Sequence, residues 1–185
     1  MYYFKGTGRE PRFLHNDDNN QLLAHYDQIH QIGTDIQFTN GAWLWKFEGI
    51  SRLQNDEHFY AVVGGFEYTL YQAVNSTADL GVLMEFMSDD RNTDPTKAPP
   101  ILTDDDVFFA TRLAMNDIQG SEILAGVIID RNDHSSMLSI EALQRLDNHW
   151  YLKLEGLWFL NIKQNTSLSS FKKDGYVTLS MSRYF

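Results

Sequence analysis

The strongest constraint on the fold of this chain is a two-residue alternation of apolar and polar side chains, which is clearest in residues 175–185. Successive side chains of a β-strand point to opposite faces. The apolar residues of this stretch share one face of an extended strand: Val177, Leu179, Met181 and Phe185. The polar residues share the other face: Thr178, Ser180, Ser182 and Tyr184. The pattern predicts a terminal strand with one apolar face.

The same alternation recurs along the whole chain. Trp43, Trp45 and Phe47, for example, alternate with Lys46 and Glu48. Such segments fit the strand period and fit a helical period poorly. The sequence predicts ten strands, over residues 1–8, 22–39, 42–52, 58–73, 79–89, 106–116, 122–130, 136–146, 149–160 and 176–185. A length of 185 residues suits one domain, so we expect a single all-β, antiparallel domain over residues 1–185.

The connections between these strands are uneven in length. If residue 185 ends at the periplasmic side of a membrane, the connections 9–21, 53–57, 90–105, 131–135 and 161–175 become extracellular. The periplasmic connections are then tight: Asn40-Gly41, residues 75–77, 117–121 and 147–149. Asn-Gly is a strong signal for a two-residue hairpin turn. Short periplasmic turns and longer outer loops are typical of transmembrane β-barrels.

Composition excludes several other classes. A net charge of −10 argues against a nucleic-acid partner. No apolar run of 18 residues exists, so no transmembrane helix is expected. The chain has no Cys, which fits a barrel that needs no disulfide. No secretory signal is visible at residues 1–5, so an exported chain would be a mature form or a C-terminal fragment.

A water-soluble barrel of the lipocalin type, or a β-sandwich, is the main structural alternative, because its strands also alternate. Two features favour the membrane barrel. The apolar face of the ten strands holds more large side chains than a small barrel interior could pack. The other face mixes small residues with pairs of opposite charges, whereas a face in contact with water would be dense in Lys and Glu.

The last strand, with its terminal Phe185, resembles the closing strand of Gram-negative outer-membrane β-barrels. Residues 65–71, 106–117 and 139–146 are similar to a poorly characterised group of bacterial porin-like proteins. The resemblance implies an antiparallel transmembrane β-barrel in the bacterial outer membrane, in which this chain supplies about ten strands as the C-terminal part of a larger barrel. It also implies outer-membrane lipid and the barrel assembly machinery as partners. The signal read by that machinery would be Val177, Leu179, Met181 and Phe185.

The face predicted to line the lumen carries charges of both signs. We expect a lumen charge network of Lys46, Glu48, Arg52, Glu67, Glu85, Arg112, Asp130, Glu141, Arg145, Lys153 and Glu155, with Asp89 as a further acid. A buried charge is costly unless it is paired. The groups would therefore form a salt-bridge plug in a narrow barrel, or line wet walls in a wider one. Glu85 and Arg112 are expected to pair, and the slight acidic excess would favour cations.

An enzyme is the competing function. Candidate groups are His25, His30, His58, His134 and His149, with Ser51, Ser88, Ser135, Ser136 and Ser139. No Gly-x-Ser-x-Gly or His-Glu-x-x-His motif accompanies them. The acidic residues 89–94 and 104–106 lack the spacing of a calcium loop. We therefore assign no catalytic, cofactor or metal residue.

The expected function is a passive pore or channel for small solutes or ions. A non-conducting structural barrel is the alternative, and a lipid-active enzyme is a third possibility. Pore and structural barrel differ in strand number, since ten strands leave an interior nearly filled by side chains and about twelve or more leave room for water.

Overall fold

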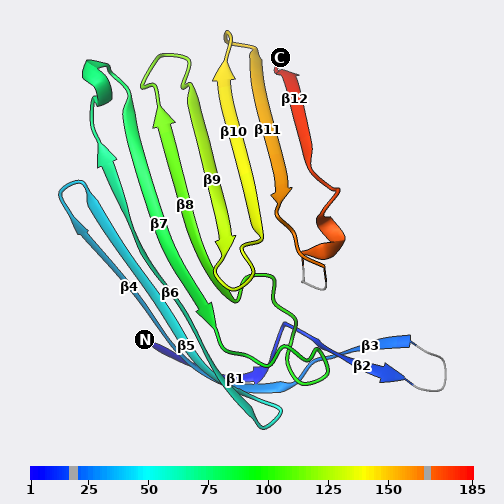
Figure 1. Ribbon diagram of the computed structural model, residues 1–185. Helices are drawn as coiled ribbons and strands as arrows, with labels where there is room; N and C mark the ends of the chain where they lie inside the picture. The colour runs from blue at the N-terminus through cyan, green and yellow to red at the C-terminus, as the bar shows by residue number, and fades with distance from the viewer. Residues whose placement is uncertain (17–20, 165–167) are drawn as a thin grey trace.

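The computed structural model describes residues 1–16, 21–164 and 168–185, and it is almost entirely β-structure (Figure 1). The strands are β1 (Tyr2–Thr7), β2 (Arg12–Asn16), β3 (Gln21–His25), β4 (Gln28–Asn40), β5 (Trp43–Gln54), β6 (Glu57–Leu70), β7 (Asp79–Asp89), β8 (Asp105–Ala114), β9 (Glu122–Asp130), β10 (Ser136–Arg145), β11 (Trp150–Leu160) and β12 (Tyr176–Arg183). Two single 3-10 turns are η1 (Ala73–Asn75) and η2 (Ser169–Phe171). Among the described residues, no helix is long and apolar enough to cross a membrane.

Ten of these strands form one antiparallel meander. Their order is β1-β4-β5-β6-β7-β8-β9-β10-β11-β12, so each strand from β4 onward pairs with its successor. The connections therefore alternate between the two ends of the sheet. The connections after β4, β6, β8 and β10 lie at one end, here named the turn end, and those after β5, β7, β9 and β11 lie at the other, the loop end (Figure 1). The predicted grouping of the connections into two ends is confirmed. The predicted lengths hold only in part, because the connection 55–56 at the loop end is tight and the connection 71–78 at the turn end is longer than predicted.

The strand boundaries differ from the prediction in the first 42 residues. The segments predicted as loop 9–21 and strand 22–39 contain a separate hairpin, formed by β2 and β3. The predicted strand 22–39 is interrupted at Tyr26 and Asp27, between β3 and β4. Residues 17–20, in that loop, and 165–167, in loop 161–175, lie outside the described residues. The first tight turn is residues 41–42, because Asn40 still pairs with Trp43. Gly41 takes a φ of +59°, which suits the first central position of such a turn.

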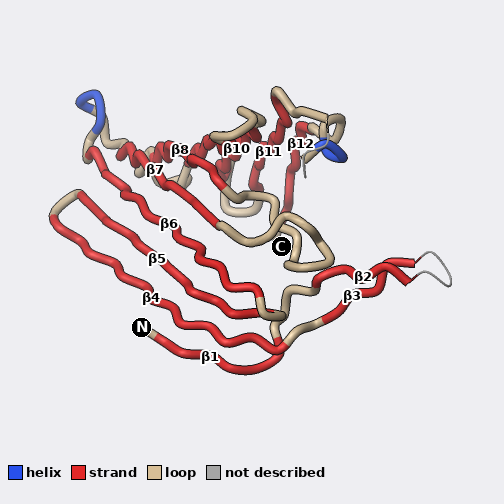
Figure 2. Tube along the Cα trace, turned by 60° about the horizontal axis from the view of Figure 1, so that its bottom comes forward, coloured by secondary structure: helices blue, strands red, loops and turns tan. Residues whose placement is uncertain are grey.

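The ten-stranded sheet is curved into a trough and is not closed into a barrel (Figure 2). Strands β1 and β12 are its two free edges. Strand β1 covers only half of β4, from Gln28 to Gly33. At the other edge β12 ends at Arg183, so Phe185 lies beyond the strand that was predicted to contain it. The all-β antiparallel class is confirmed, while closure is absent from the described structure.

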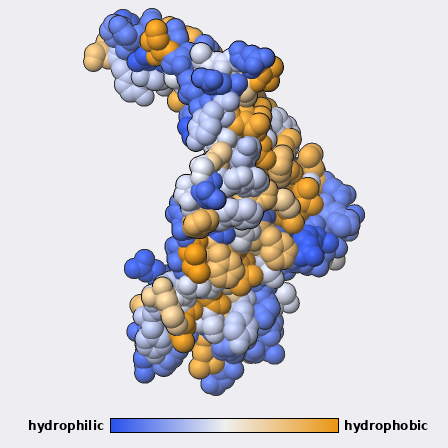
Figure 3. Space-filling model, turned by 90° about the vertical axis from the view of Figure 1, so that its left-hand side faces the viewer, coloured by the Kyte–Doolittle hydropathy of each residue, from blue (hydrophilic) through white to orange (hydrophobic). Residues whose placement is uncertain are grey.

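The strand register sorts side chains into two faces. Direct partners share a face, and partners such as Trp45–Phe66, Phe66–Met84 and Leu154–Leu179 run from strand to strand. This face, here named the apolar face, leaves large side chains exposed: Ile36 is 57% exposed, Phe38 59% and Leu179 67%. Hydrophobic patches over the strands are visible in Figure 3. The predicted facing of Phe66, Tyr68, Val82, Leu113, Leu154 and Leu179 on one side is confirmed by the register.

The opposite face, here named the charged face, lines the hollow of the trough. The connection between β7 and β8 packs against it at the loop end and lies on the inner side of the curve in Figure 2. Most of the buried residues gather there, including Ile29, Phe59, Ala98 and Pro99. The side-chain core is therefore small and sits at one end, so most of the sheet depends on its backbone ladder.

Gly65 permits the close approach of β6 and β7. A Cβ added at Gly65 would lie 2.1 Å from the carbonyl oxygen of Met84 and 2.8 Å from the Cα of Glu85, both backbone atoms. A Cβ on the neighbouring Gly64 would make only ordinary contacts, at 3.5 Å from the ring of Phe47 and 3.9 Å from the carbonyl oxygen of Lys46. The two adjacent glycines thus form a matched pair for testing the local packing.

We expect Gly65→Ala to lower the free energy of unfolding by about 1–3 kcal/mol, because the added carbon forces a backbone shift. Gly64→Ala should change it little. Urea titrations of both variants in the same detergent or buffer measure the difference. Equal midpoints for the two variants would contradict the described register between β6 and β7.

Candidate functional site: the charged hollow of the sheet

All eleven residues predicted to form a lumen charge network lie on the charged face. The register aligns them with one another through shared partners, as in Leu124–Glu141–Glu155 and Lys46–Gly65–Glu85. The full set is Lys46, Glu48, Arg52, Glu67, Glu85, Arg112, Asp130, Glu141, Arg145, Lys153 and Glu155. The alternation in the sequence thus correctly predicts that these side chains share one face, but it does not predict which of them form ion pairs.

The ion pairs of the charged face run both along and across the strands. Lys153 lies 3.0 Å from Glu141 of β10 and 3.0 Å from Glu155 of its own strand. Lys46 lies 3.9 Å from Glu67 of β6 and 4.0 Å from Glu85 of β7. Each lysine therefore sits between two acids. These side chains are about one-quarter to one-half exposed, so solvent screens each pair and its contribution to stability is small.

The prediction that Glu85 pairs with Arg112 is wrong, because each residue has another partner. The two side chains share the charged face, but Arg112 donates to Glu122 of the next strand at 2.7 Å. The register sets Gly81 opposite Arg112 and Phe108 opposite Glu85, four residues farther along β8. The long connection between β7 and β8 does not set this register, so the sequence alone could not place the two residues side by side.

Acids outnumber bases on this face. In the described strands it also carries Asp35, Glu57, Asp79, Asp106 and Glu122, and no further Lys or Arg. Asp35 directly opposes Glu48 across β4 and β5, two like charges without a basic residue directly opposite either. The wall of the hollow therefore has a negative potential, which attracts cations.

The connection between β7 and β8 closes part of the hollow at the loop end. Arg91 donates to both carboxylate oxygens of Asp89, at 2.9 and 2.6 Å, and its guanidinium stacks on Phe59 at 4.8 Å from the ring centre. Arg52 also faces this ring, and Glu10 bridges the two arginines at 2.7 and 3.4 Å. Arg91 is only 7% exposed and Asp89 5%. The side chains at this end are packed and little exposed, in contrast to the exposed pairs farther along the strands.

A second network ties the β2–β3 hairpin to the same connection. Arg12 donates to Asp27 at 2.7 Å and to the carbonyl of Thr96 at 2.8 Å. The backbone N–H of Phe13 donates to the carbonyl of Pro95 at 2.8 Å. Gln54 donates to the same oxygen of Asp27 at 3.1 Å. The hairpin, the β7–β8 connection and the start of β4 are therefore held as one unit.

A cavity of about 500 Å³ lies beside this unit. Its lining includes Arg91, Asp104, Asp130 and Asp133, from the β7–β8 connection, the end of β9 and the β9–β10 turn. Nearby, Asp106 is buried opposite Asp130, and one of its carboxylate oxygens has no hydrogen-bond partner. The loop end thus holds a small, acidic compartment.

The acidic residues of the β7–β8 connection are used in local hydrogen bonds. Asp94 accepts from the N–H and hydroxyl of Thr96, and Asp104 accepts from the N–H of Asp105. Asp90 accepts from the N–H of Tyr60. Within the part of the chain that the structure describes, no group of three acidic or histidine side chains could hold a metal ion.

One of the candidate Ser–His pairs comes together. The hydroxyl of Ser51 lies 2.9 Å from Nε2 of His58, on the apolar face near the loop end. The ring of Tyr60 packs edge-on against His58. Of the other candidate histidines, His25 contacts Asp27 and His30 contacts the hydroxyl of Tyr3. In the described residues no carboxylate is hydrogen-bonded to the His58 ring, so the pair lacks the third group of a triad.

Comparisons of the chain with protein-family models, with curated proteins and with solved structures each found no match. The functional argument therefore rests on the two faces of the sheet and on the packed loop end.

Asp27 gives the loop-end unit a pH dependence. Burial tends to raise the pKa of Asp27, but hydrogen bonds from Arg12 and Gln54 hold it below the ordinary value. A carboxyl with a lowered pKa stabilises the fold above its unfolded value of about 3.9 and loses that contribution as pH falls through the folded pKa. Hydrogen exchange of the Phe13 amide reports on the stability of the loop-end unit, because this amide donates to the carbonyl of Pro95 and so links the β2–β3 hairpin to the β7–β8 connection.

We expect hydrogen-exchange protection of the Phe13 amide, corrected for intrinsic rates, to disappear as pH falls below about 4. Asp27→Asn should weaken protection by about 1–3 kcal/mol at neutral pH and remove the pH dependence. Arg12→Ala should do the same at neutral pH. Protection that persists undiminished in acid would show that Asp27 does not hold the unit.

Proposed function

We propose that this chain forms the wall of a membrane-spanning β-barrel in a bacterial outer membrane and provides a passive pore for small ions or solutes. The observation that carries the proposal is the exposed apolar face, which continues from β4 to β12 while most charged residues of these strands lie on the opposite face. A sheet with apolar residues outside and polar residues inside is the arrangement that lipid requires.

Water is a poor match for the apolar face. Proteins in water rarely expose contiguous apolar patches larger than a few hundred Å². Here Ile36, Phe38, Trp45, Leu179 and Met181, from three strands, are all about half exposed or more. A bilayer covers such a surface without any specific partner. The stacked rings of Trp43 and Trp45, 5.4 Å apart near the turn end, suit the aromatic belt of a membrane boundary.

The charged face supports passage of cations. Its ion pairs are partly exposed, and acids outnumber bases along the strands. The packed connection around Arg91 narrows the hollow at the loop end. The acidic cavity beside this connection leaves room for small ions to pass. Small cations would therefore be favoured over anions and over large solutes.

Closure of the barrel requires partners for the edges of β1 and β12. Their ladder groups would be unsatisfied in a bilayer, where open sheet edges do not occur. The edges would pair with each other, or with strands outside this chain in a larger barrel. The close packing around Arg91 and Phe59 favours a second function, a non-conducting structural barrel, if the barrel has only ten strands.

Planar-bilayer recording of the purified protein tests the pore. We expect discrete conductance steps and a reversal potential on the cation-selective side in a salt gradient. Glu48→Gln should reduce cation selectivity, because Glu48 and Asp35 form an acidic pair on the charged face.

Asp147→Asn is the matched control, because Asp147 caps a tight turn at the turn end and lies outside the strands. It should leave selectivity unchanged. Insertion without any conductance would favour the structural barrel, and failure to insert would contradict the membrane location.

A further inference from the structure

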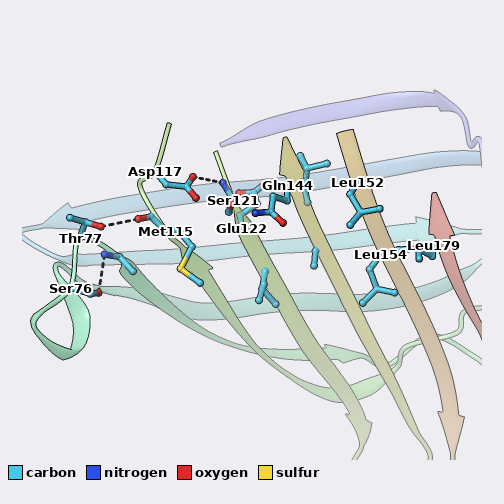
Figure 4. Close-up of a pocket in the computed structure, with 14 residues that line it drawn as sticks. Ser76, Thr77, Met115, Asp117, Ser121, Glu122, Gln144, Leu152, Leu154 and Leu179 are labelled. Carbon is cyan, nitrogen blue, oxygen red and sulfur yellow. Dashed lines mark hydrogen bonds between the residues drawn. The ribbon is translucent and has the colours of Figure 1, made fainter. Parts of the chain in front are cut away.

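A groove of about 660 Å³ opens on the apolar face at the turn end of the sheet (Figure 4). Its volume lies within the range of about 300–1,000 Å³ typical of small-molecule sites. It is lined by the turn before β7, the β8–β9 turn, the ends of β9 to β11 and the middle of β12. The charged hollow described above lies on the other side of the sheet.

The groove exists because a small residue interrupts a row of large ones. Ile123, Ala142, Leu154 and Leu179 are successive register partners from β9 to β12. Ala142 is the only small side chain in that row, so the surface dips between Ile123 and Leu154. The next row toward the turn end is Gln144 and Leu152. The floor is therefore apolar, with a polar amide at its margin.

The groove has a polar end and an apolar end. In Figure 4, Ser76, Thr77 and Asp117 lie toward one end, and Leu152, Leu154 and Leu179 lie toward the other. A ligand that fits must be amphipathic, with its polar part at the turns and its chain directed across β10 to β12.

The charge at the polar end is negative. The carboxylate at this end is that of Asp117, because the carboxylate of Glu122, a residue that also lines the groove, turns to the charged face and pairs there with Arg112 at 2.7 Å. The backbone N–H of Ser121 donates to Asp117 at 2.8 Å and holds its pKa below the ordinary value, so this carboxyl is ionised at neutral pH. An ammonium group complements this end, whereas a net anionic headgroup is repelled.

We infer that this groove binds one lipid with a primary ammonium headgroup, of the phosphatidylethanolamine class, with one acyl chain over Ala142. The inference rests on the proposed membrane location and deepens it, because it names a lipid that the outer surface selects. The ammonium group pairs with Asp117, and the acyl chain contacts Ile123, Leu154 and Leu179.

Native mass spectrometry of the detergent-purified protein, after incubation with equimolar phosphatidylethanolamine and phosphatidylglycerol of the same acyl chains, tests the inference. Wild type should retain one phosphatidylethanolamine at least about tenfold more often than phosphatidylglycerol, as for a difference of about 1.4 kcal/mol. Ala142→Phe should fill the dip and abolish retention.

The matched control is Ala125→Phe, because Ala125 lies on the apolar face of β9, opposite Thr111 and Ile140, and outside the groove. It should retain the lipid as wild type does. Asp117→Asn should keep the lipid but lose the headgroup preference, whereas Asp147→Asn, in the neighbouring turn, should keep the preference. Equal retention of phosphatidylethanolamine by Ala142→Phe and Ala125→Phe would overturn the inference. Equal retention of the two lipids by wild type would also overturn it.

Photo-crosslinking of wild type with a phosphatidylethanolamine that carries a diazirine in its acyl chain removes any dependence on the folding of a variant. Adducts should map to residues 142–144 and 152–154, and adducts spread evenly over the apolar face would overturn the site. Co-flotation with vesicles separates the two proposals. If the protein floats but does not retain phosphatidylethanolamine selectively, only the proposed lipid binding in the groove is contradicted. If it retains the lipid but does not float, only the proposed membrane location is contradicted.

Discussion

The interstrand hydrogen-bond ladder holds this molecule together, because its side-chain core is small. Few large side chains are buried, and most of the buried residues gather under the β7–β8 connection at the loop end. A meander of ten strands needs no core to satisfy its interior backbone groups, since each strand pairs with its neighbours. The same ladder becomes obligatory in lipid, where no water competes for the backbone. The unusual balance of a long ladder and a small core is what a membrane favours.

The two faces of the sheet contribute differently: the apolar face contributes to stability, and the charged face contributes to the surface potential. The apolar face supplies free energy only when something covers it, at about 25 cal/mol per Å² of apolar surface removed from water. The charged face supplies little stability, because its pairs around Lys46 and Lys153 are partly exposed. Its contribution is a surface potential. The loop end combines both kinds of packing, since Arg91 is buried, paired with Asp89 and stacked on Phe59.

Sequence patterning predicted the ten strands of the main sheet, their order along the chain and the shared face of the eleven charged residues assigned to the lumen. These features depend on a period of two that is local to each strand. The β2–β3 hairpin was missed because its two five-residue strands lie within a segment that also reads as one loop and one long strand. The partner of Arg112 was missed because a register across a long connection is set by packing elsewhere. Closure was not predictable either, since it depends on how far ten twisted strands curve.

The most direct test of the account is whether the apolar face meets lipid. The chain has no Cys, so single cysteines can be introduced and labelled without background. Fluorophores placed in turn at residues 177–182 of β12, in protein reconstituted into vesicles with quenchers on the acyl chains, report the environment of each face. The account predicts strong quenching at Val177, Leu179 and Met181 and weak quenching at the alternate positions Thr178, Ser180 and Ser182. Uniform quenching along β12, or none at the apolar positions, would contradict it.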